Sequence, residues 1–425
     1  MLDIVIILCK IAVALGIVLG MVPVLIWAER KGSAFIQDRI GPNRARILGI
    51  RMGGFIHNLA DVIKLLTKED IVPGNVNKLY FIMAPAIVMA VALLTFAVIP
   101  FADTIELWGR IIPLQVADLN VGILYLIAVA SLGIYGIVLG GWSSNNKYSL
   151  LGALRSAAQM FSYEIAMGLS IVGILMVFGS VRLNEIVRSQ GELLWGFLPK
   201  WGVLVQPLGF LLFLVTAFAE TNRNPFDLPE GESELVGGYH TEYSSMKFAL
   251  FFMGEYANVA VGAAIVTSLF FGGWQVPYLP THILIEKADM LFPAALSILA
   301  IVIILLGIKT LSVSLTRRYR YNDLRDFEGI VFGVPMVAIG LAIGLFLLFG
   351  PVVHFSDTGS RIFAACMQFG TFLIKLVFFA WLFIWVRWTL PRFRYDQLMR
   401  LGWKVLMPLA LVNIFVTGVI ILLCT

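Results

Sequence analysis

The chain has 425 residues, of which 60% are hydrophobic and 13% are charged, and its formal net charge is +5 at pH 7. Soluble domains carry roughly 25% charged residues, so this composition and a mean hydropathy of +0.91 exclude an ordinary soluble protein. The three cysteines and four histidines form no CxxC motif and no Cys/His cluster, which argues against haem, zinc or an iron–sulfur centre in this chain.

Ten apolar runs are each near the roughly 20 residues that a helix needs to cross the hydrocarbon core of a bilayer. Because these runs are too continuously apolar for barrel strands, the sequence predicts an all-α polytopic membrane protein with one integral membrane domain over 1–425. The first run lacks the basic start and the cleavage site of a signal peptide, so it is predicted to be retained. The predicted spans are 4–27, 79–101, 119–140, 158–179, 202–219, 247–271, 291–310, 329–351, 369–389 and 405–424.

The distribution of Lys and Arg predicts the orientation of these helices. Most of the 31 Lys and Arg residues lie in or beside the loops that follow odd-numbered spans. Basic loops stay on the cytoplasmic side, so we expect both termini outside, in the plasma (inner) membrane of a bacterium. The same asymmetry explains the sequence pI of about 9.0, and no nucleic-acid partner is expected.

The first long cytoplasmic loop, 28–78, contains an amphipathic segment with the sequence GGFIHNLADVIKLLTKED. Its apolar residues recur at helical spacing and share one face: Phe55, Ile56, Leu59, Ile63 and Leu66. This pattern predicts a helix that lies in the membrane interface, packs on neighbouring protein, or does both.

A second cytoplasmic loop, 220–246, concentrates acidic residues in the stretch AETNRNPFDLPEGESELVGGYHTE. It carries one cation, Arg223, against six carboxylates: Glu220, Asp227, Glu230, Glu232, Glu234 and Glu242. Like charges held close near a low dielectric cannot all ionise, so such a cluster is suited to take up and release protons. A solvated acidic turn is the alternative, but apolar residues stand between the acids and two X-Pro steps favour a defined turn.

Three further carboxylates lie within or beside predicted spans: Glu29, Glu164 and Glu255. A charged residue at bilayer depth costs at least about 2.5–3.5 kcal/mol, so one that is kept there indicates a function or an ion pair. Glu29 is followed by two cations, which favours a structural ion pair, whereas Glu164 and Glu255 have no cation near in sequence. A line of acids leading inward from the cytoplasmic face supports either proton transport or an ion-coupled partner.

Four long motifs occur in order along the chain: AERKGSAFIQDRIGPNR, ALRSAAQMFSYE, AETNRNPFDLPEGESELVGGYHTEYSSMKFALFFMGEYAN and RWTLPRFRYDQLMRLGWKVLMPLAL. With these motifs the sequence resembles the H membrane subunit of bacterial NADH:quinone oxidoreductase (respiratory complex I) and is similar to mitochondrial NADH dehydrogenase subunit 1. The resemblance covers about 1–271 and 369–425. It implies a subunit that joins the membrane arm to the peripheral arm, helps form the quinone chamber, and couples quinone reduction to proton translocation through a chain of acids.

The resemblance also implies roles for individual residues, and it places no catalytic residue and no metal ligand in this chain. The expected proton relay consists of Glu164, Asp227, Glu230, Glu232, Glu234, Glu242 and Glu255. The residues expected to line or brace the quinone chamber, or to lie beside the path of the quinone tail, are Glu29, Arg30, Arg155, Phe252, Met253 and Arg392. The amphipathic stretch 53–66 would lie at the quinone entrance.

Quinone, as ubiquinone or menaquinone, is the substrate that the resemblance implies, with flavin and iron–sulfur clusters on partner subunits. The implied partners are the quinone-reducing subunits of the peripheral arm, small subunits of the membrane arm and the lipid bilayer. Reduction of the quinone would change the charge in the chamber and shift protonation along the carboxylates, a bias then passed to distant proton channels.

Eight of the ten predicted spans match the family, and two, near 291–310 and 329–351, are additional. They lie in the region 272–368, ahead of the motif PRFRYDQLM, where the family connects more directly. An insertion of two spans preserves the orientation of every later helix. A lipid-facing brace or a contact to an accessory subunit is the role expected for it.

Several other functions compete with this interpretation. The homologous membrane subunit of an energy-converting hydrogenase or formate hydrogenlyase is the nearest, but the run FDLPEGESEL favours quinone chemistry. A complex I-like enzyme fed by ferredoxin stays open, because the electron input lies on other chains. A stand-alone secondary transporter is disfavoured since no inverted repeat is visible, and a purely structural anchor would tolerate acid-to-amide substitutions.

Overall fold

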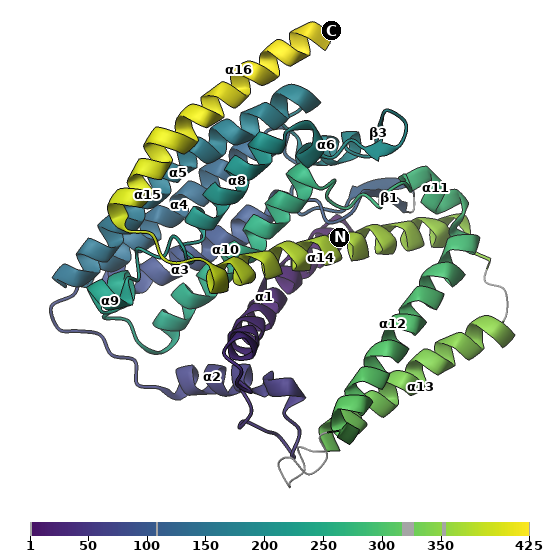
Figure 1. Cartoon of the computed structure of the whole chain (residues 1–425), viewed down its shortest axis with the longest axis horizontal. Helices are drawn as coiled ribbons and strands as arrows, with labels where there is room; N and C mark the ends of the chain where they lie inside the picture. Colours follow the sequence, from purple (N-terminus) through teal and green to yellow (C-terminus); the bar gives the residue numbers. More distant parts are fainter. Residues whose placement is uncertain (1, 108, 317–326, 351–353, 425) are drawn as a thin grey trace.

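The computed structural model of the chain describes residues 2–107, 109–316, 327–350 and 354–424, which are mostly helical (Figure 1). Nine helical stretches of this described part are long and apolar enough to cross a membrane. They are α1 (Leu2–Ile36), α3 (Lys78–Thr95), α4 (Gly122–Ser143), α5 (Lys147–Phe178), α10 (Ser245–Phe270), α12 (Ala288–Thr316), α13 (Glu328–Phe349), α14 (Asp357–Thr389), and the run of α15 (Tyr395–Leu401), a π-helical turn (Gly402–Leu406) and α16 (Met407–Cys424). The all-α polytopic class predicted from the sequence is confirmed.

The fifth predicted span, 202–219, is shorter than the others. It is divided at Gln206 into α7 (Gly202–Val205) and α8 (Pro207–Glu220). Pro207 begins α8 at the first helical position, where the missing N–H of proline would have no partner in any case. The 14 residues of α8 extend about 21 Å, less than the hydrocarbon core of roughly 30 Å. Glu220, its last residue, therefore ends the helix before it could have crossed the core.

Two helices begin well before their predicted starts, because polar residues form their first turns. The side chain of Asn146 accepts a hydrogen bond from the Tyr148 N–H at 2.8 Å and so caps α5 eleven residues before the predicted start at 158. The side chain of Ser356 accepts from the Gly359 N–H at 3.2 Å and caps α14 in the same way. Such caps satisfy the free N–H groups of a first helical turn, and hydropathy alone does not detect them.

Short elements connect the long helices. The short helices are α2 (Ile56–Thr67), α6 (Leu183–Ser189), α9 (Glu232–Leu235), α11 (Thr281–Glu286) and 3-10 turns at Met52–Gly54, Phe96–Val98 and Gly238–His240. The strands form two antiparallel hairpins, β1 (Thr104–Leu107) with β2 (Arg110–Pro113) and β3 (Leu193–Leu194) with β4 (Leu198–Pro199). Thr104 lies opposite Pro113, and Leu193 lies opposite Pro199.

Helix α10 is at the centre of the molecule and packs against α1, α3 and α14. Small residues line it on several sides, and Ala257, Ala260, Ala263 and Ala264 are completely buried. Small side chains let neighbouring backbones approach closely in a membrane protein. Glu255 is on this helix and is only 5% exposed, so the helix that carries it is enclosed by protein and not by lipid.

Helix α2 occupies the predicted amphipathic segment. Its Asn58 is buried and donates to the Pro23 carbonyl oxygen of α1 at 2.7 Å, which fixes the helix on the bundle. The apolar side chains of Leu59, Ile63 and Leu66 remain exposed. Ile56 of the same face is buried. The described part of the chain therefore covers the start of the apolar face of α2 and leaves its remainder exposed.

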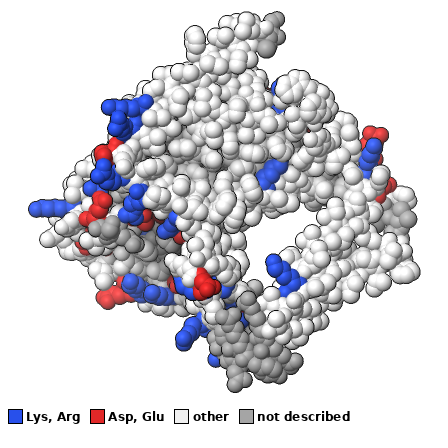
Figure 2. Space-filling model, viewed as in Figure 1, with Lys and Arg blue, Asp and Glu red and all other residues white. Residues whose placement is uncertain are grey.

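Helices α12 and α13 form an antiparallel hairpin that stands beside the rest of the molecule (Figure 1). Their backbones are close: a Cβ added at Gly340 would lie 2.5 Å from Ile304 and 3.0 Å from the Ala300 carbonyl oxygen. At one end the hairpin contacts α11 and α14. At the other end, Glu328 accepts hydrogen bonds from Arg51 at 2.6 Å and from the Gly53 N–H at 2.9 Å. Figure 2 shows a hollow between the hairpin and the body of the molecule.

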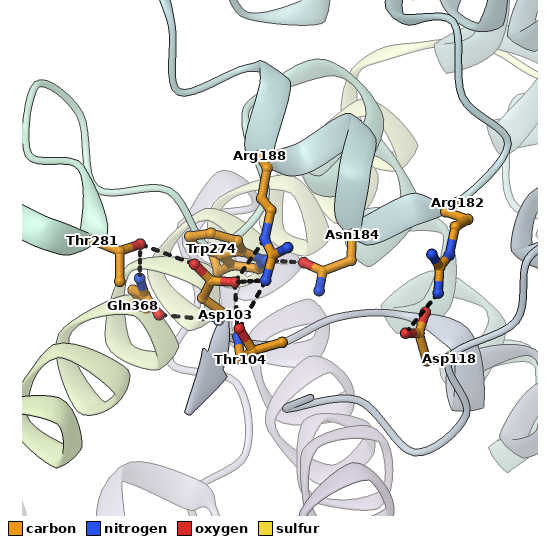
Figure 3. Close-up of polar contacts among 9 residues, drawn as sticks. All are labelled: Asp103, Thr104, Asp118, Arg182, Asn184, Arg188, Trp274, Thr281 and Gln368. Atoms are coloured by element: carbon orange, nitrogen blue, oxygen red, sulfur yellow. Dashed lines mark hydrogen bonds and ion pairs between the residues drawn. The ribbon is translucent and has the colours of Figure 1, made fainter. Parts of the chain in front are cut away.

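At the end of α10 away from the acidic loop, Asp103 joins four segments of the chain (Figure 3). Its carboxylate accepts from the Arg188 guanidinium at 2.6 and 2.9 Å and from the Thr281 hydroxyl at 3.0 Å. Its backbone N–H donates to Gln368 of α14 at 3.0 Å, and Gln368 in turn donates to Thr281 at 2.9 Å. The polar groups of this cluster bind one another, so we interpret it as a structural connection between the loops at this end of the bundle.

We predict that Asp103→Asn lowers the apparent melting temperature of the purified, detergent-solubilised protein. The amide cannot neutralise Arg188, and a hydrogen bond to a charged group contributes about 1.5–3 kcal/mol. The melting temperature can be followed by intrinsic tryptophan fluorescence. Glu192→Gln is the matched control, because Glu192 pairs with Lys200 on the exposed surface. An equal, negligible effect of both substitutions would contradict the structural role of Asp103.

Candidate functional site

The acidic loop between α8 and α10 is folded into the protein and is not a solvated turn. Phe226, Leu228, Leu235 and Tyr239 of this loop are all buried. Asn224 donates to the carbonyl oxygens of Arg387, in α14, and of Leu390, directly after it, each at 3.3 Å. The Phe393 N–H donates to the Pro225 carbonyl oxygen at 3.0 Å. The loop is thus anchored in two ways: its apolar residues are buried in the protein, and its polar residues form hydrogen bonds with the end of α14.

A buried arginine is the centre of the site. The side chain of Arg223 is 8% exposed and lies between two carboxylates, with its nitrogen atoms 3.9 Å from Glu29 and 3.6 Å from Glu255. Its guanidinium also lies over the Tyr256 ring, 4.1 Å from the centroid. Burial lowers the pKa of Arg223. Tyr256 and the neighbouring acids raise this pKa by more than burial lowers it, so it lies above its ordinary value. Arg223 is therefore a fixed positive charge.

Both carboxylates that face Arg223 have further partners. Glu255 accepts a hydrogen bond from the Tyr239 hydroxyl at 2.8 Å. Burial, and then the charges of Glu255 and Glu230, raise the pKa of Tyr239 well above its ordinary value, so Tyr239 remains a donor. Glu29 accepts from the Tyr256 hydroxyl at 2.9 Å and from Arg387 of α14. The site thus joins α1, α10, α14 and the acidic loop.

A second acid–base pair, Asp227 with Arg392, extends the cluster toward the end of α14. Arg392 donates to the Asp227 carboxylate at 2.5 Å. Burial and the charge of Glu230 nevertheless raise the pKa of Asp227 to about 7, because together they outweigh the attraction of Arg392 and Arg223. Glu230 lies 3.9 Å from His240. Asp227 is therefore able to exchange a proton near neutral pH.

Farther into the bundle, Glu220 and Glu164 form a separate group. The Glu220 carboxylate lies within electrostatic range of Glu164, and Glu164 accepts a hydrogen bond from Ser131 of α4. The Glu220 Oε2 atom is buried and has no hydrogen-bond partner in the described part of the chain. Glu220 lines a cavity of about 50 Å³ that also reaches Asn258, one turn beyond Glu255 on α10. The cavity therefore lies between the inner acids and the helix of the Arg223 cluster.

Several residues predicted for the relay or the chamber lie outside the Arg223 cluster. Glu234 pairs with Arg155 at 2.6 Å and is half exposed, and Glu242 accepts from Asn146 at 2.6 Å. Arg30 pairs with Asp61 of α2. The side chain of Glu232 is outside the described part of the structure. The acidic loop is accordingly not one uniformly coupled group of carboxylates.

The two apolar residues predicted beside the quinone tail lie next to the cluster. The Phe252 ring is 6.0 Å from the Arg223 guanidinium and 4.9 Å from the Tyr256 ring. Met253 follows it on α10, and both side chains are partly buried. An apolar surface thus borders a buried cation, a combination suited to a ligand with a polar head and an apolar tail.

The site residues assigned from the sequence did not include five members of the site: Glu220, Arg223, Tyr239, Tyr256 and Arg387. Arg223 was visible as the one cation of the acidic stretch, and a buried acid cluster requires such a charge. The partners of Arg223 and Glu29 come from distant helices, so no local pattern indicated them. Among the described residues, no group of three His, Cys, Asp or Glu side chains is arranged to hold a metal ion.

The fold and the site define a polytopic helical membrane protein with ionisable groups buried around an arginine. Comparison with known proteins gives the family. A profile described as NADH dehydrogenase matches residues 9–343 and 325–418. The chain is 42% identical over 397 residues to the NADH-quinone oxidoreductase H subunit 1 of Cytophaga hutchinsonii. This alignment covers 93% of this chain and 91% of that relative. It therefore belongs to the NADH dehydrogenase family that the H subunits of NADH-quinone oxidoreductase represent.

Other relatives are similar over nearly their whole length. The NADH-quinone oxidoreductase H subunit 1 of Geobacter metallireducens is 43% identical over 422 residues, 99% of this chain and 98% of that relative. NADH-quinone oxidoreductase subunit 8 of Rhodothermus marinus is 43% identical over 92% of this chain and 90% of its own length. The alignment with the Geobacter relative spans the region of the α12–α13 hairpin as well.

The raised pKa of Asp227 leads to a prediction on pH dependence. The pKa in the folded protein, about 7, exceeds the ordinary value of about 3.9, so protonated Asp227 favours the folded state at low pH. This contribution is fully present below the ordinary pKa and is lost as the pH rises through about 7. Infrared difference spectra should show the carbonyl stretch of a protonated carboxyl disappearing near neutral pH, and Asp227→Asn should abolish that change.

Glu234→Gln is the control for this titration, because Glu234 is an ion-paired acid of the same loop that is half exposed. It should leave the neutral-pH signal in place. A signal that has vanished by the ordinary carboxyl range, about pH 4, would show that Asp227 is not held protonated.

Proposed function

We propose that this chain is the coupling subunit of a proton-pumping NADH:quinone oxidoreductase, in which it forms part of the quinone chamber and carries the acids that link quinone reduction to proton translocation. The enzyme would lie in a bacterial plasma membrane, with the basic loops cytoplasmic and both termini outside. The family assignment supports this function. The observation that carries it furthest is the buried Arg223 between Glu29 and Glu255.

Arg223 is suited to respond to a change of charge in the chamber. Its Nε and Nη2 atoms are buried without hydrogen-bond partners in the described part of the chain. A cavity of about 10 Å³ is bordered by Arg223, Glu29 and Tyr256, and a volume of this order is at the lower limit for one water molecule. The donors of Arg223 are thus available to a water molecule or to an oxygen atom of a bound quinone.

The quinone would take its electrons from an iron–sulfur cluster on a partner subunit. Negative charge arriving beside Arg223 would compete with Glu29 and Glu255 for the guanidinium. A carboxylate that loses part of its ion pair in a buried place binds a proton more tightly. Proton uptake by Glu255, with Tyr239 holding the other side of that carboxylate, would then follow from electrostatics alone.

A route for this proton toward the inner acids is supported by the cavity at Glu220. Its volume of about 50 Å³ exceeds what one water molecule needs, and buried waters bridge polar groups that lack partners. Asn258, Thr221 and Thr95 are polar groups on its wall. A water molecule there would connect the α10 side with Glu220, and Glu164 lies within electrostatic range beyond it.

Glu255→Gln tests the relay in the assembled enzyme. The amide keeps the shape of the side chain but cannot carry the proton or face Arg223 as an anion. We expect proton pumping in proteoliposomes to fall about tenfold or more, since a positioned acid–base group contributes typically 10²–10⁴-fold. Glu230→Gln and Glu232→Gln should also reduce pumping.

Glu192→Gln, an acid paired with Lys200 on the outer loop, is the control and should pump normally. Flavin and iron–sulfur content should be unchanged in every variant, which shows that the complex has assembled. Intact quinone reduction together with intact pumping in the three relay variants would show that these carboxylates are not the relay.

Phe252→Ala tests the quinone chamber separately. If Phe252 lies along the quinone tail, its truncation should raise the KM for quinone by about tenfold, equivalent to about 1.4 kcal/mol, while the number of protons pumped per electron stays the same. Phe161→Ala is the control, because Phe161 is exposed on α5. An unchanged KM for quinone, whether or not the pumping stoichiometry falls, would show that Phe252 does not line the path of the quinone tail.

A further inference from the structure

A pocket of about 890 Å³ lies between the α12–α13 hairpin and the body of the molecule. Its walls come from the end of α1, the loop that follows it, the second half of α12 and the first turns of α13. Figure 2 shows the hollow that separates the hairpin from the body on the visible face. The site around Arg223 shares no residue with this pocket, so the proposed function leaves it unexplained.

One part of the pocket wall is apolar. Leu306 and Val313 of α12, Phe332 of α13 and Phe35 of α1 contribute to it, and Phe35 is 68% exposed. Both helices of the hairpin are long and apolar enough to cross the hydrocarbon layer. Water in a gap with such walls would be unfavourable, so in a bilayer hydrocarbon chains are suited to fill the gap.

The other part of the wall is positively charged. Four cations and two carboxylates line the pocket: Lys31, Arg39, Arg51, Lys309, Asp38 and Glu328. The Arg51–Glu328 ion pair is internally neutral, which leaves three cations against Asp38. Arg39 donates to the neutral side chain of Gln37 at 2.7 Å, and Lys309 has no polar partner within the described part of the chain. The pocket thus has an excess of positive charge beside an apolar wall.

We propose that this pocket binds the head group of an anionic phospholipid, with Lys309 and Arg39 contacting the phosphate and the acyl chains lying between the hairpin and α1. Basic pockets between membrane helices on the cytoplasmic side are suited to such head groups. A quinone ring offers no negative charge in its oxidised form and would not use the cations. The lipid would fill the gap that the hairpin leaves, and so hold the hairpin against the body where direct contacts are few.

Native mass spectrometry of the intact complex tests this proposal. The complex is stripped of loosely bound lipid and titrated with phosphatidylglycerol or with phosphatidylcholine of the same acyl chains. The wild-type complex should bind one phosphatidylglycerol that phosphatidylcholine does not displace at equal concentration. Each Lys or Arg near a membrane surface contributes about 1 kcal/mol to binding an anionic lipid, which is about fivefold in affinity.

The variants locate the lipid in this pocket. Lys309→Gln and Arg39→Gln should each weaken phosphatidylglycerol binding about fivefold, and the double variant more than either. Lys309→Arg keeps the charge and should retain the affinity. Lys404→Gln is the matched control: Lys404 is an exposed lysine near the start of α16, outside the pocket lining.

Three results would overturn the proposal. They are equal binding of the two lipids, an unchanged affinity in the double variant, and a polypeptide of another subunit occupying the gap in a density map of the complex. Because the readout is lipid binding and not electron transfer, failure of this proposal leaves the proposed function untouched. Failure of the Glu255 and Phe252 tests would equally leave the lipid site standing.

Discussion

Arg223 is a cation with its side chain 8% exposed, held in place by Glu29 on α1 and Glu255 on α10. Removing one partner of a buried ion pair costs about 3–5 kcal/mol, because the remaining charge has no water to solvate it. The buried charge of Arg223 therefore requires α1, α10, α14 and the acidic loop to stay packed around it. The Tyr239 and Tyr256 hydroxyls and the Arg387 guanidinium complete the neutralisation of the two carboxylates.

The same requirement explains why the acidic loop is unlike its neighbours. Its buried apolar side chains and its hydrogen bonds to the end of α14 bring Asp227 to Arg392 and keep Glu230 near the cluster. Burial then makes Asp227 a group that titrates close to neutral pH. At the other end of α10, the polar groups of the Asp103 cluster bind one another and connect the loops there. The two clusters contain similar residue types. They differ because the Arg223 cluster has buried polar atoms without hydrogen-bond partners in the described part of the chain.

Local patterns predicted the membrane helices, the amphipathic α2 segment and the acids of the site, since hydrophobicity and helical spacing depend on neighbours in sequence. Helix starts were less well predicted where polar caps such as Asn146 and Ser356 begin a helix ahead of its apolar part. The sequence also did not predict which acids of the loop have partners of their own and which lie at the buried site. Glu234 and Glu242 have partners of their own, whereas Glu220, absent from the predicted relay, faces an internal cavity.

The sequence by itself determined that the chain is a helical membrane protein with carboxylates in or beside its apolar helices, because the length of apolar runs and the positions of charges in them follow from the residues alone. It also carried the motifs that identify the family. Only the tertiary structure decided which acids share a cation, because Glu29 and Arg387 are separated by most of the chain and meet at Arg223. It likewise decided that the α12–α13 hairpin leaves a cationic gap beside α1. Ion pairs and pockets depend on distances between helices, and no spacing along one segment contains those distances.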